Sequence, residues 1–152
     1  MKNEIIMKTT AIMVYDVDLN NLLMCRRTKE PYLGLYNLVG GKIDLGEEHI
    51  DSAYRELEEE TGINRDDISL LHFMNFDYFD RGVQVDVYLG ILNKKKELVE
   101  EVNPLVWMPL DSDFSDSSLM AGEGSIAHML NMAAIQIPEL QQTGRPLKRD
   151  KF

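Results

Sequence analysis

Acidic residues recur at fixed intervals in one stretch of the chain, which runs from Gly41 to Ile63. The fixed positions are filled by Gly41, Glu47, Arg55, Glu56, Leu57, Glu59, Glu60, Gly62 and Ile63. If residues from about 48 to 61 form a helix, its period of roughly 3.6 residues places Glu56, Glu59 and Glu60 together, beside an apolar face. Hard divalent cations such as Mg²⁺ and Mn²⁺ prefer oxygen ligands of this kind. The spacing therefore predicts a metal site.

A solvated helix face is the alternative interpretation of these charges. Residues 47–51 bring acidic side chains to the start of the predicted helix, where negative charge is stabilising. The glutamates between Glu56 and Glu60, however, crowd its last turns, where the helix dipole disfavours each by roughly 0.3–1 kcal/mol. Like charges three or four residues apart also repel one another. A bound cation would turn this repulsion into attraction, so metal binding is the simpler interpretation.

Glycines lie at both ends of the predicted helix. Gly40 and Gly41 precede it, and paired glycines permit close approaches that side chains forbid, although an ordinary turn would also explain them. Gly62 follows the last helical turn and is interpreted as a C-terminal cap. No chemistry is assigned to Gly62.

The interval pattern from Gly41 to Ile63 resembles the signature of the Nudix hydrolases, also called MutT-type pyrophosphohydrolases. Every fixed position of that signature is filled. The resemblance implies an α/β/α sandwich with a mixed sheet, in which the signature forms a loop-helix-loop motif. It also implies hydrolysis of a nucleoside diphosphate that is linked to another group.

The resemblance assigns roles to residues of the signature. The expected metal ligands are Glu56, Glu59, Glu60 and the carbonyl of Gly40, and the expected cofactor is Mg²⁺, with Mn²⁺ as a substitute. Arg55 and Glu47 resemble the pair that orients the helix and its carboxylates. The metal would activate water and neutralise phosphate charge, so no covalent nucleophile is required.

Two glutamates are candidates for the general base. One is Glu59, within the signature. The other is Glu101, which stands six residues before Trp107, because MutT-type members often contribute a glutamate from a loop shortly before a tryptophan. Glu100 is its rival, and a solvated loop would also explain both residues. The histidines His49, His72 and His128 stand in unrelated segments and enter no predicted site.

Substrate choice depends on residues outside the signature. Asn37 and Lys42, which flank the glycines, resemble enzymes that hydrolyse oxidised purine nucleoside triphosphates, and Arg27 matches a cation near their substrate pocket. Glu123 comes from the corresponding loop before the last helix. That loop lacks the tryptophan and paired acids of those enzymes, and Val39 replaces a common proline. The candidate substrate-binding residues are Arg27, Asn37, Gly41, Lys42 and Glu123.

The first hypothesis is therefore hydrolysis of a purine nucleoside triphosphate, including oxidised forms, to monophosphate and pyrophosphate. ADP-ribose or a sugar nucleotide is the alternative substrate. The aromatic residues Tyr36, Phe76 and Tyr78 are available for base stacking but are equally suited to a core. Two alternative hypotheses require no catalysis: a nucleotide sensor and an acidic interaction module.

Hydrophobic patterning predicts the elements that surround the signature. The predicted elements are a hairpin of strands 9–15 and 22–27, a loop over 28–37, a second hairpin of strands 68–79 and 83–92, a short strand within 104–110, a helix within 123–136 and a tail from about 137. Helices interleaved with strands indicate an α/β fold even without the resemblance. Residues 1–152 show no repeat or linker and are expected to form one Nudix domain.

Composition limits the classes of function. The 152 residues are 44% apolar and 28% charged, as is usual for globular proteins, and no apolar run reaches the roughly 20 residues that span a bilayer. The formal net charge of −10 disfavours binding to the backbone of nucleic acids. The single cysteine, Cys25, lies in an apolar run and is expected to be buried. We expect a cytoplasmic monomer or homodimer that acts on a small nucleotide, without membrane or nucleic-acid partners.

Overall fold

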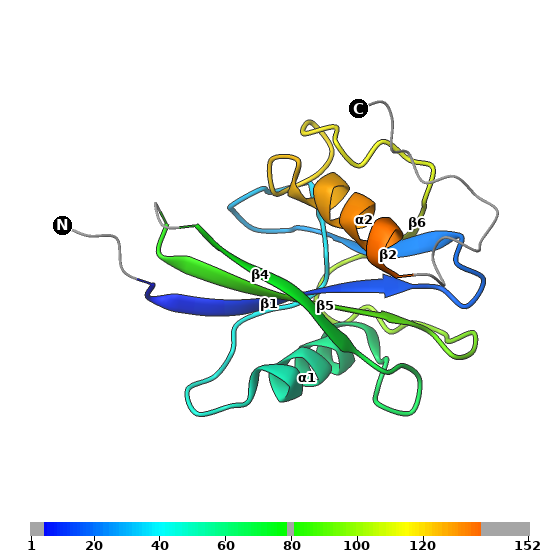
Figure 1. Cartoon of the computed structure of the whole chain (residues 1–152), viewed down its shortest axis with the longest axis horizontal. Helices are drawn as coiled ribbons and strands as arrows, with labels where there is room; N and C mark the ends of the chain where they lie inside the picture. Colours follow the sequence, from blue (N-terminus) through cyan, green and yellow to red (C-terminus); the bar gives the residue numbers. More distant parts are fainter. Residues whose placement is uncertain (1–4, 79–80, 138–152) are drawn as a thin grey trace.

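The computed structural model describes residues 5–78 and 81–137 (Figure 1). Its elements are β1 (Met7–Tyr15), β2 (Asn21–Arg26), β3 (Tyr36–Asn37), α1 (His49–Thr61), β4 (Leu71–Tyr78), β5 (Val83–Ile91), β6 (Leu105–Pro109) and α2 (Ser125–Gln136). The predicted hairpins, central helix, short strand and last helix are all present. The two-residue strand β3 lies within the predicted loop, because Tyr36 and Asn37 pair with the end of β2. The predicted tail beyond residue 137 lies outside the described residues.

The sheet is mixed. Its strand order is β3-β2-β1-β5-β4, and β6 pairs with β2. β1 and β5 run parallel along their whole length, from Met7 opposite Val83 to Tyr15 opposite Ile91, whereas the other strand pairs are antiparallel. The segment after β3 also follows β1, through bridges at Val39 and Lys42. This segment therefore brings the glycines of the signature against the first half of β1.

The two helices cover opposite faces of the sheet (Figure 1). Alternate residues of β1 divide between two apolar clusters: Ile12 and Val14 pack with Leu57 of α1, whereas Met13 and Tyr15 pack with Leu130 of α2. This alternation follows from the two-residue period of a strand, whose side chains point to opposite faces in turn. The result is the predicted α/β/α sandwich.

Helix α1 has an apolar inner side and a charged outer side. Ala53 and Leu57 are fully buried, and Ile50 and Tyr54 pack against the same cluster. Gly62 adopts a left-handed conformation with φ of 82°, and its N–H donates to the carbonyl of Glu58. This geometry confirms Gly62 as the C-terminal cap. None of the helices within the described residues is long and apolar enough to cross a membrane.

The hydroxyl of Tyr15 is buried without a hydrogen-bond partner among the described residues. The hydroxyl of Tyr54, by contrast, accepts a hydrogen bond from the Leu70 N–H at 2.7 Å. A buried unpaired polar group costs about 1–3 kcal/mol, whereas loss of a satisfied hydrogen bond destabilises by about 1 kcal/mol. We therefore expect Tyr15→Phe to preserve or raise the free energy of unfolding and Tyr54→Phe to lower it. Urea unfolding would check both, and equal destabilisation by the two substitutions would contradict the contrast.

Candidate active site

The guanidinium of Arg55 joins the carboxylates at the start of α1 to those near its end. It bonds Glu47 through Nε at 2.8 Å and Nη2 at 3.0 Å, Glu56 at 3.0 Å and Glu59 at 3.3 Å. Its Nη2 also donates to the carbonyl of Lys42 at 3.1 Å. These hydrogen bonds lower the pKa of Glu47 to about 2 and raise the pKa of Arg55 itself. Arg55 thus contacts Glu47, Glu56 and Glu59 together, and its orienting role stays a prediction.

Glu60 points inward rather than along the charged face of the helix. Its side chain accepts a hydrogen bond from the Gly40 N–H at 2.9 Å, and the residue is only 9% exposed. Burial, followed by the neighbouring Glu56 carboxylate, raises the pKa of Glu60 to about 7 despite this bond. Burial also raises the pKa of Glu56. The site therefore contains two carboxylates whose charges lack full compensation.

Gly40 and Gly41 are required for two different close approaches. A Cβ on Gly40 would lie 2.1 Å from the carbonyl oxygen of Thr10 in β1, and its φ of 148° disfavours other residues. A Cβ on Gly41 would lie 2.3 Å from the Glu56 carboxylate. The first glycine therefore lets the loop pack on the sheet, and the second leaves room for a candidate metal ligand.

A cavity of about 370 Å³ adjoins these groups. Five predicted site residues line it: Arg27, Asn37, Gly40, Gly41 and Glu60. Phe76 and Tyr78 contribute aromatic rings that stand 5.3 Å apart, edge to face. Cys25 also lines the cavity, but burial raises the pKa of its thiol to about 12. A thiol with so high a pKa is a poor nucleophile, which agrees with the prediction that Cys25 is a buried strand residue.

The other predicted site residues do not line this cavity. Lys42 pairs with β1 and contributes its carbonyl to Arg55. Glu101 is exposed on the loop before β6, and the neighbouring Glu100 accepts a hydrogen bond from the Leu105 N–H at 2.9 Å. Glu100 is therefore engaged in its own loop, which leaves Glu101 as the freer of the two glutamates.

Glu123 belongs to a cluster that joins three loops at the mouth of the cavity. It accepts hydrogen bonds from the Tyr32 hydroxyl at 2.9 Å and from Arg81 at 3.1 Å, and Arg81 also donates to the Tyr32 hydroxyl at 3.0 Å. The Tyr32 hydroxyl, followed by Arg81, lowers the pKa of Glu123. Tyr32 and Arg81 line the cavity, with Glu123 held by both. Sequence spacing gives no signal for Tyr32 or Arg81, because only the fold brings their loops together.

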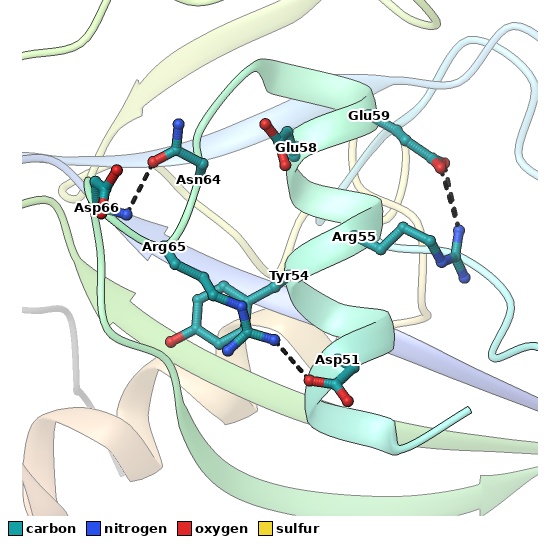
Figure 2. Close-up of a pocket in the computed structure, with 8 residues that line it drawn as sticks. All are labelled: Asp51, Tyr54, Arg55, Glu58, Glu59, Asn64, Arg65 and Asp66. Atoms are coloured by element: carbon teal, nitrogen blue, oxygen red, sulfur yellow. Dashed lines mark hydrogen bonds and ion pairs between the residues drawn. The ribbon is translucent and has the colours of Figure 1, made fainter. Parts of the chain in front are cut away.

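The outer side of α1 forms a second, polar hollow (Figure 2). Glu58 and Glu59 both line this hollow, and Arg55 lies beside Glu59, one helical turn away. Arg65 stacks on the ring of Tyr54 at 3.9 Å. The predicted ligands are therefore divided: Glu59 faces outward, whereas Glu60 faces the inner cavity.

The chemistry of the donor set fits a hard divalent cation. Glu56 and Glu60 supply oxygens, both are largely shielded from solvent, and burial disfavours the charge on each of them. A cation beside them would stabilise that charge. Within residues 5–78 and 81–137, no three side chains of the histidine, cysteine, aspartate and glutamate types are already arranged to hold a metal ion. The carboxylates are instead bound to Arg55 and to the Gly40 N–H.

Comparison with known proteins agrees with this geometry. The NUDIX domain family model matches residues 7–119. The chain is 28% identical over 111 residues to the 8-oxo-dGTP diphosphatase of Escherichia coli K12, a match that covers 72% of this chain and 86% of that protein. The chain therefore belongs to the NUDIX domain family, and this membership together with its similarity to a diphosphatase indicates a pyrophosphohydrolase.

Solved structures show the same fold. A MutT structure from a study of Aliivibrio salmonicida and Vibrio cholerae matches with a TM-score of 0.61 and 19% identity, covering 90% of this chain and 95% of that one. A Caenorhabditis elegans Ap4A hydrolase matches with a TM-score of 0.66 and 17% identity, covering 84% and 96%. The NUDIX domain of Shewanella oneidensis NrtR with ADP ribose matches with a TM-score of 0.65 and 19% identity, covering 87% and 89%.

The two glycines should respond differently to substitution. Gly40→Ala forces a Cβ against the backbone of Thr10, so we expect a loss of about 2–4 kcal/mol of stability. Gly41→Ala meets the movable end of Glu56, so stability should fall less, while hydrolysis falls at least about tenfold because a site carboxylate is displaced. Thermal unfolding and nucleotide hydrolysis would be measured for both. Full activity in a folded Gly41→Ala variant would contradict this account of Glu56.

Glu60 should make the stability of the metal-free protein depend on pH. Its pKa is raised from 4.5 to about 7, so between these values the folded state keeps a proton that the unfolded state has released. The free energy of unfolding should therefore fall as pH rises through this range, by on the order of 1–3 kcal/mol. Glu60→Gln should flatten most of this dependence. Chemical denaturation at several pH values with a chelator present would test this prediction. If the free energy of unfolding of Glu60→Gln depended on pH as strongly as that of the wild type, a group other than Glu60 would be responsible.

Proposed function

We propose that this protein hydrolyses purine nucleoside triphosphates, including oxidised forms, to the monophosphate and pyrophosphate, with a divalent metal ion. The observation that carries the proposal is the continuity of the cavity. The same cavity is lined by Glu60, Gly40 and Gly41 and by Asn37, Phe76 and Tyr78. A nucleotide has matching chemistry, because its phosphates bind a metal held by carboxylates and its base packs against aromatic and polar side chains.

The metal would be Mg²⁺ or Mn²⁺, held by Glu56 and Glu60 with Glu59 and the Gly40 carbonyl as the other proposed ligands. A metal bound there supplies charge neutralisation for the phosphates and lowers the pKa of a bound water. Arg55 and Glu47 orient the carboxylates. Among structures of similar fold, a bifunctional enzyme from Francisella tularensis was solved with AMP and a manganese ion.

The water that attacks phosphorus needs a base within hydrogen-bond reach. Glu59 and Glu101 remain the proposed bases. Glu59 is already bound by the Arg55 guanidinium at 3.3 Å. Glu101 is exposed on a loop beside the cavity residue Asn103. The surroundings therefore favour Glu101 as the residue that accepts the proton.

Among purine substrates, Asn37 favours guanine over adenine. Its side-chain oxygen accepts a hydrogen bond from the Leu38 N–H at 2.9 Å, which leaves the amide NH₂ as the group available to a ligand in the cavity. An NH₂ group pairs with a carbonyl oxygen, which guanine and 8-oxoguanine carry and adenine lacks. Lys42 and Glu123 are retained as outer residues of the binding site, the latter acting through Tyr32 and Arg81.

ADP-ribose and sugar nucleotides form the alternative substrate class. The similarity of fold to a NUDIX domain bound to ADP ribose supports this alternative, whereas the name of the Escherichia coli relative supports a triphosphate. The half-buried Glu56 and the buried Glu60 argue against a sensor without catalysis, because binding alone does not require two carboxylates at elevated pKa.

The proposal is tested by Mg²⁺-dependent hydrolysis of 8-oxo-dGTP, dGTP, dATP, ADP-ribose, a sugar nucleotide and a dinucleoside polyphosphate, with the products identified. Release of pyrophosphate and a guanine monophosphate, with dATP a poor substrate, is the expected result. Preference for ADP-ribose would contradict the proposed substrate but not the proposed role of the carboxylates. No turnover of any compound would favour the sensor.

Glu56→Gln, Glu59→Gln and Glu60→Gln should each lower kcat by at least about a hundredfold while the protein remains folded, because each removes a charge from the metal site without changing its volume. Glu58→Gln is the matched control, since Glu58 lies on the same helix but is exposed on its outer side (Figure 2). Its kcat should stay near that of the wild type. Equal loss in all four variants would point to a general electrostatic effect rather than metal ligation.

A further inference from the structure

Asn103 lies at the rim of the cavity and has no role in the signature. It is one of the residues that line the cavity, two positions after Glu101 and at the end of the loop before β6. Its side-chain oxygen accepts a hydrogen bond from the Thr28 hydroxyl at 3.0 Å. This bond joins the loop that carries Glu101 to the loop that follows β2.

The hydrogen bond fixes which end of the amide faces the cavity. Because the oxygen of Asn103 is bound to Thr28, its NH₂ group is the end left for another partner, and it has none among residues 5–78 and 81–137. The backbone beside it is also held, since the Arg26 N–H donates to the carbonyl of Pro104 at 2.9 Å. The Asn103 NH₂ group is therefore oriented by the hydrogen bond to Thr28, and the adjoining backbone is held by the hydrogen bond between Arg26 and Pro104.

Asn103 lies across from Arg27, a cation that lines the same cavity. Strands β2 and β6 pair Cys25 with Leu105, so Asn103 lies beside the residues that follow Cys25. Among them is Arg27, whose charge acts on Glu60. Asn103 and Arg27 thus line the same cavity as Glu60 and supply hydrogen-bond donors to it, so a ligand beside them must offer oxygen acceptors.

We propose that the Asn103 NH₂ group donates a hydrogen bond to an oxygen of the bound nucleotide, and that Thr28 is the positioning residue for this contact. The inference rests on the proposed nucleotide substrate. Phosphate and ribose oxygens are the two sources of such an acceptor. The contact also ties the substrate to the loop of Glu101, so that loss of Asn103 affects both binding and the placement of the proposed base.

Asn103→Asp is the decisive substitution, because it keeps the size and the acceptor for Thr28 but replaces the donor by a charged oxygen. With Mg²⁺ present, we expect the Kd for dGMP to rise about tenfold or more, and the KM for dGTP to rise in parallel, since a repulsive group replaces a hydrogen bond. Asn103→Ala should give a smaller rise. Asn20→Asp is the control, since it adds the same charge on the exposed turn between β1 and β2 and should leave Kd unchanged.

The role of Thr28 is tested by a double-mutant cycle. Thr28→Val removes the hydroxyl and should weaken dGMP binding about threefold, because the amide loses its orientation. The same change should have no further effect in the Asn103→Ala background, and Thr28→Ser should bind as the wild type does. Independent effects of the two substitutions would overturn the positioning role.

Calorimetric titration with pyrophosphate and with dGMP identifies the acceptor, and it does not depend on turnover. Weaker binding of both ligands to Asn103→Asp places the contact on phosphate, whereas weaker binding of dGMP alone places it on the nucleoside. Unchanged Kd for both ligands in a variant that unfolds at the wild-type temperature would overturn the proposal. Turnover of the wild type tests the proposed hydrolysis separately, so the two conclusions can fail independently.

Discussion

The close grouping of carboxylates in α1 and in the loop before it depends on the positive charge of one guanidinium, that of Arg55. Four carboxylates in this region, those of Asp44, Glu47, Glu56 and Glu59, lie within 3.5 Å of Arg55. Without a cation, like charges so close together would repel one another and oppose helix formation. Arg55 reduces this cost, but Glu60 lies beyond the groups that it contacts. The fold thus holds its carboxylates close together while leaving Glu60 for another positive charge to stabilise.

Close packing at two glycines gives this electrostatic arrangement its geometry. The loop before α1 lies against β1 because Gly40 has no side chain to meet Thr10, and Glu56 fits behind Gly41 for the same reason. The Gly40 N–H then reaches Glu60 directly. Packing and charge are therefore coupled here, since a change in backbone position would alter the environment of both Glu56 and Glu60.

The cavity beside these carboxylates is built from loops that are distant in the sequence. The loop after β2 contributes Tyr32, the connection between β4 and β5 contributes Arg81, and the segment before α2 holds Glu123. Each of these contacts is exposed, and exposed ion pairs contribute little to stability. These contacts therefore determine the shape of the cavity entrance more than they stabilise the fold. Specificity can change in these loops while the carboxylate site is preserved.

The sequence by itself determined the local features. The spacing of acidic and apolar residues predicted α1 and its cap at Gly62, because helix periodicity and glycine conformation are properties of neighbouring residues. Alternating strands predicted the α/β class, and the family resemblance supplied the layered fold. Tertiary structure alone decided that Glu60 turns inward while Glu59 faces outward, since this depends on the approach of Gly40. It also decided that Tyr32 and Arg81 meet Glu123, because chain segments with no common pattern become neighbours only when the sheet forms.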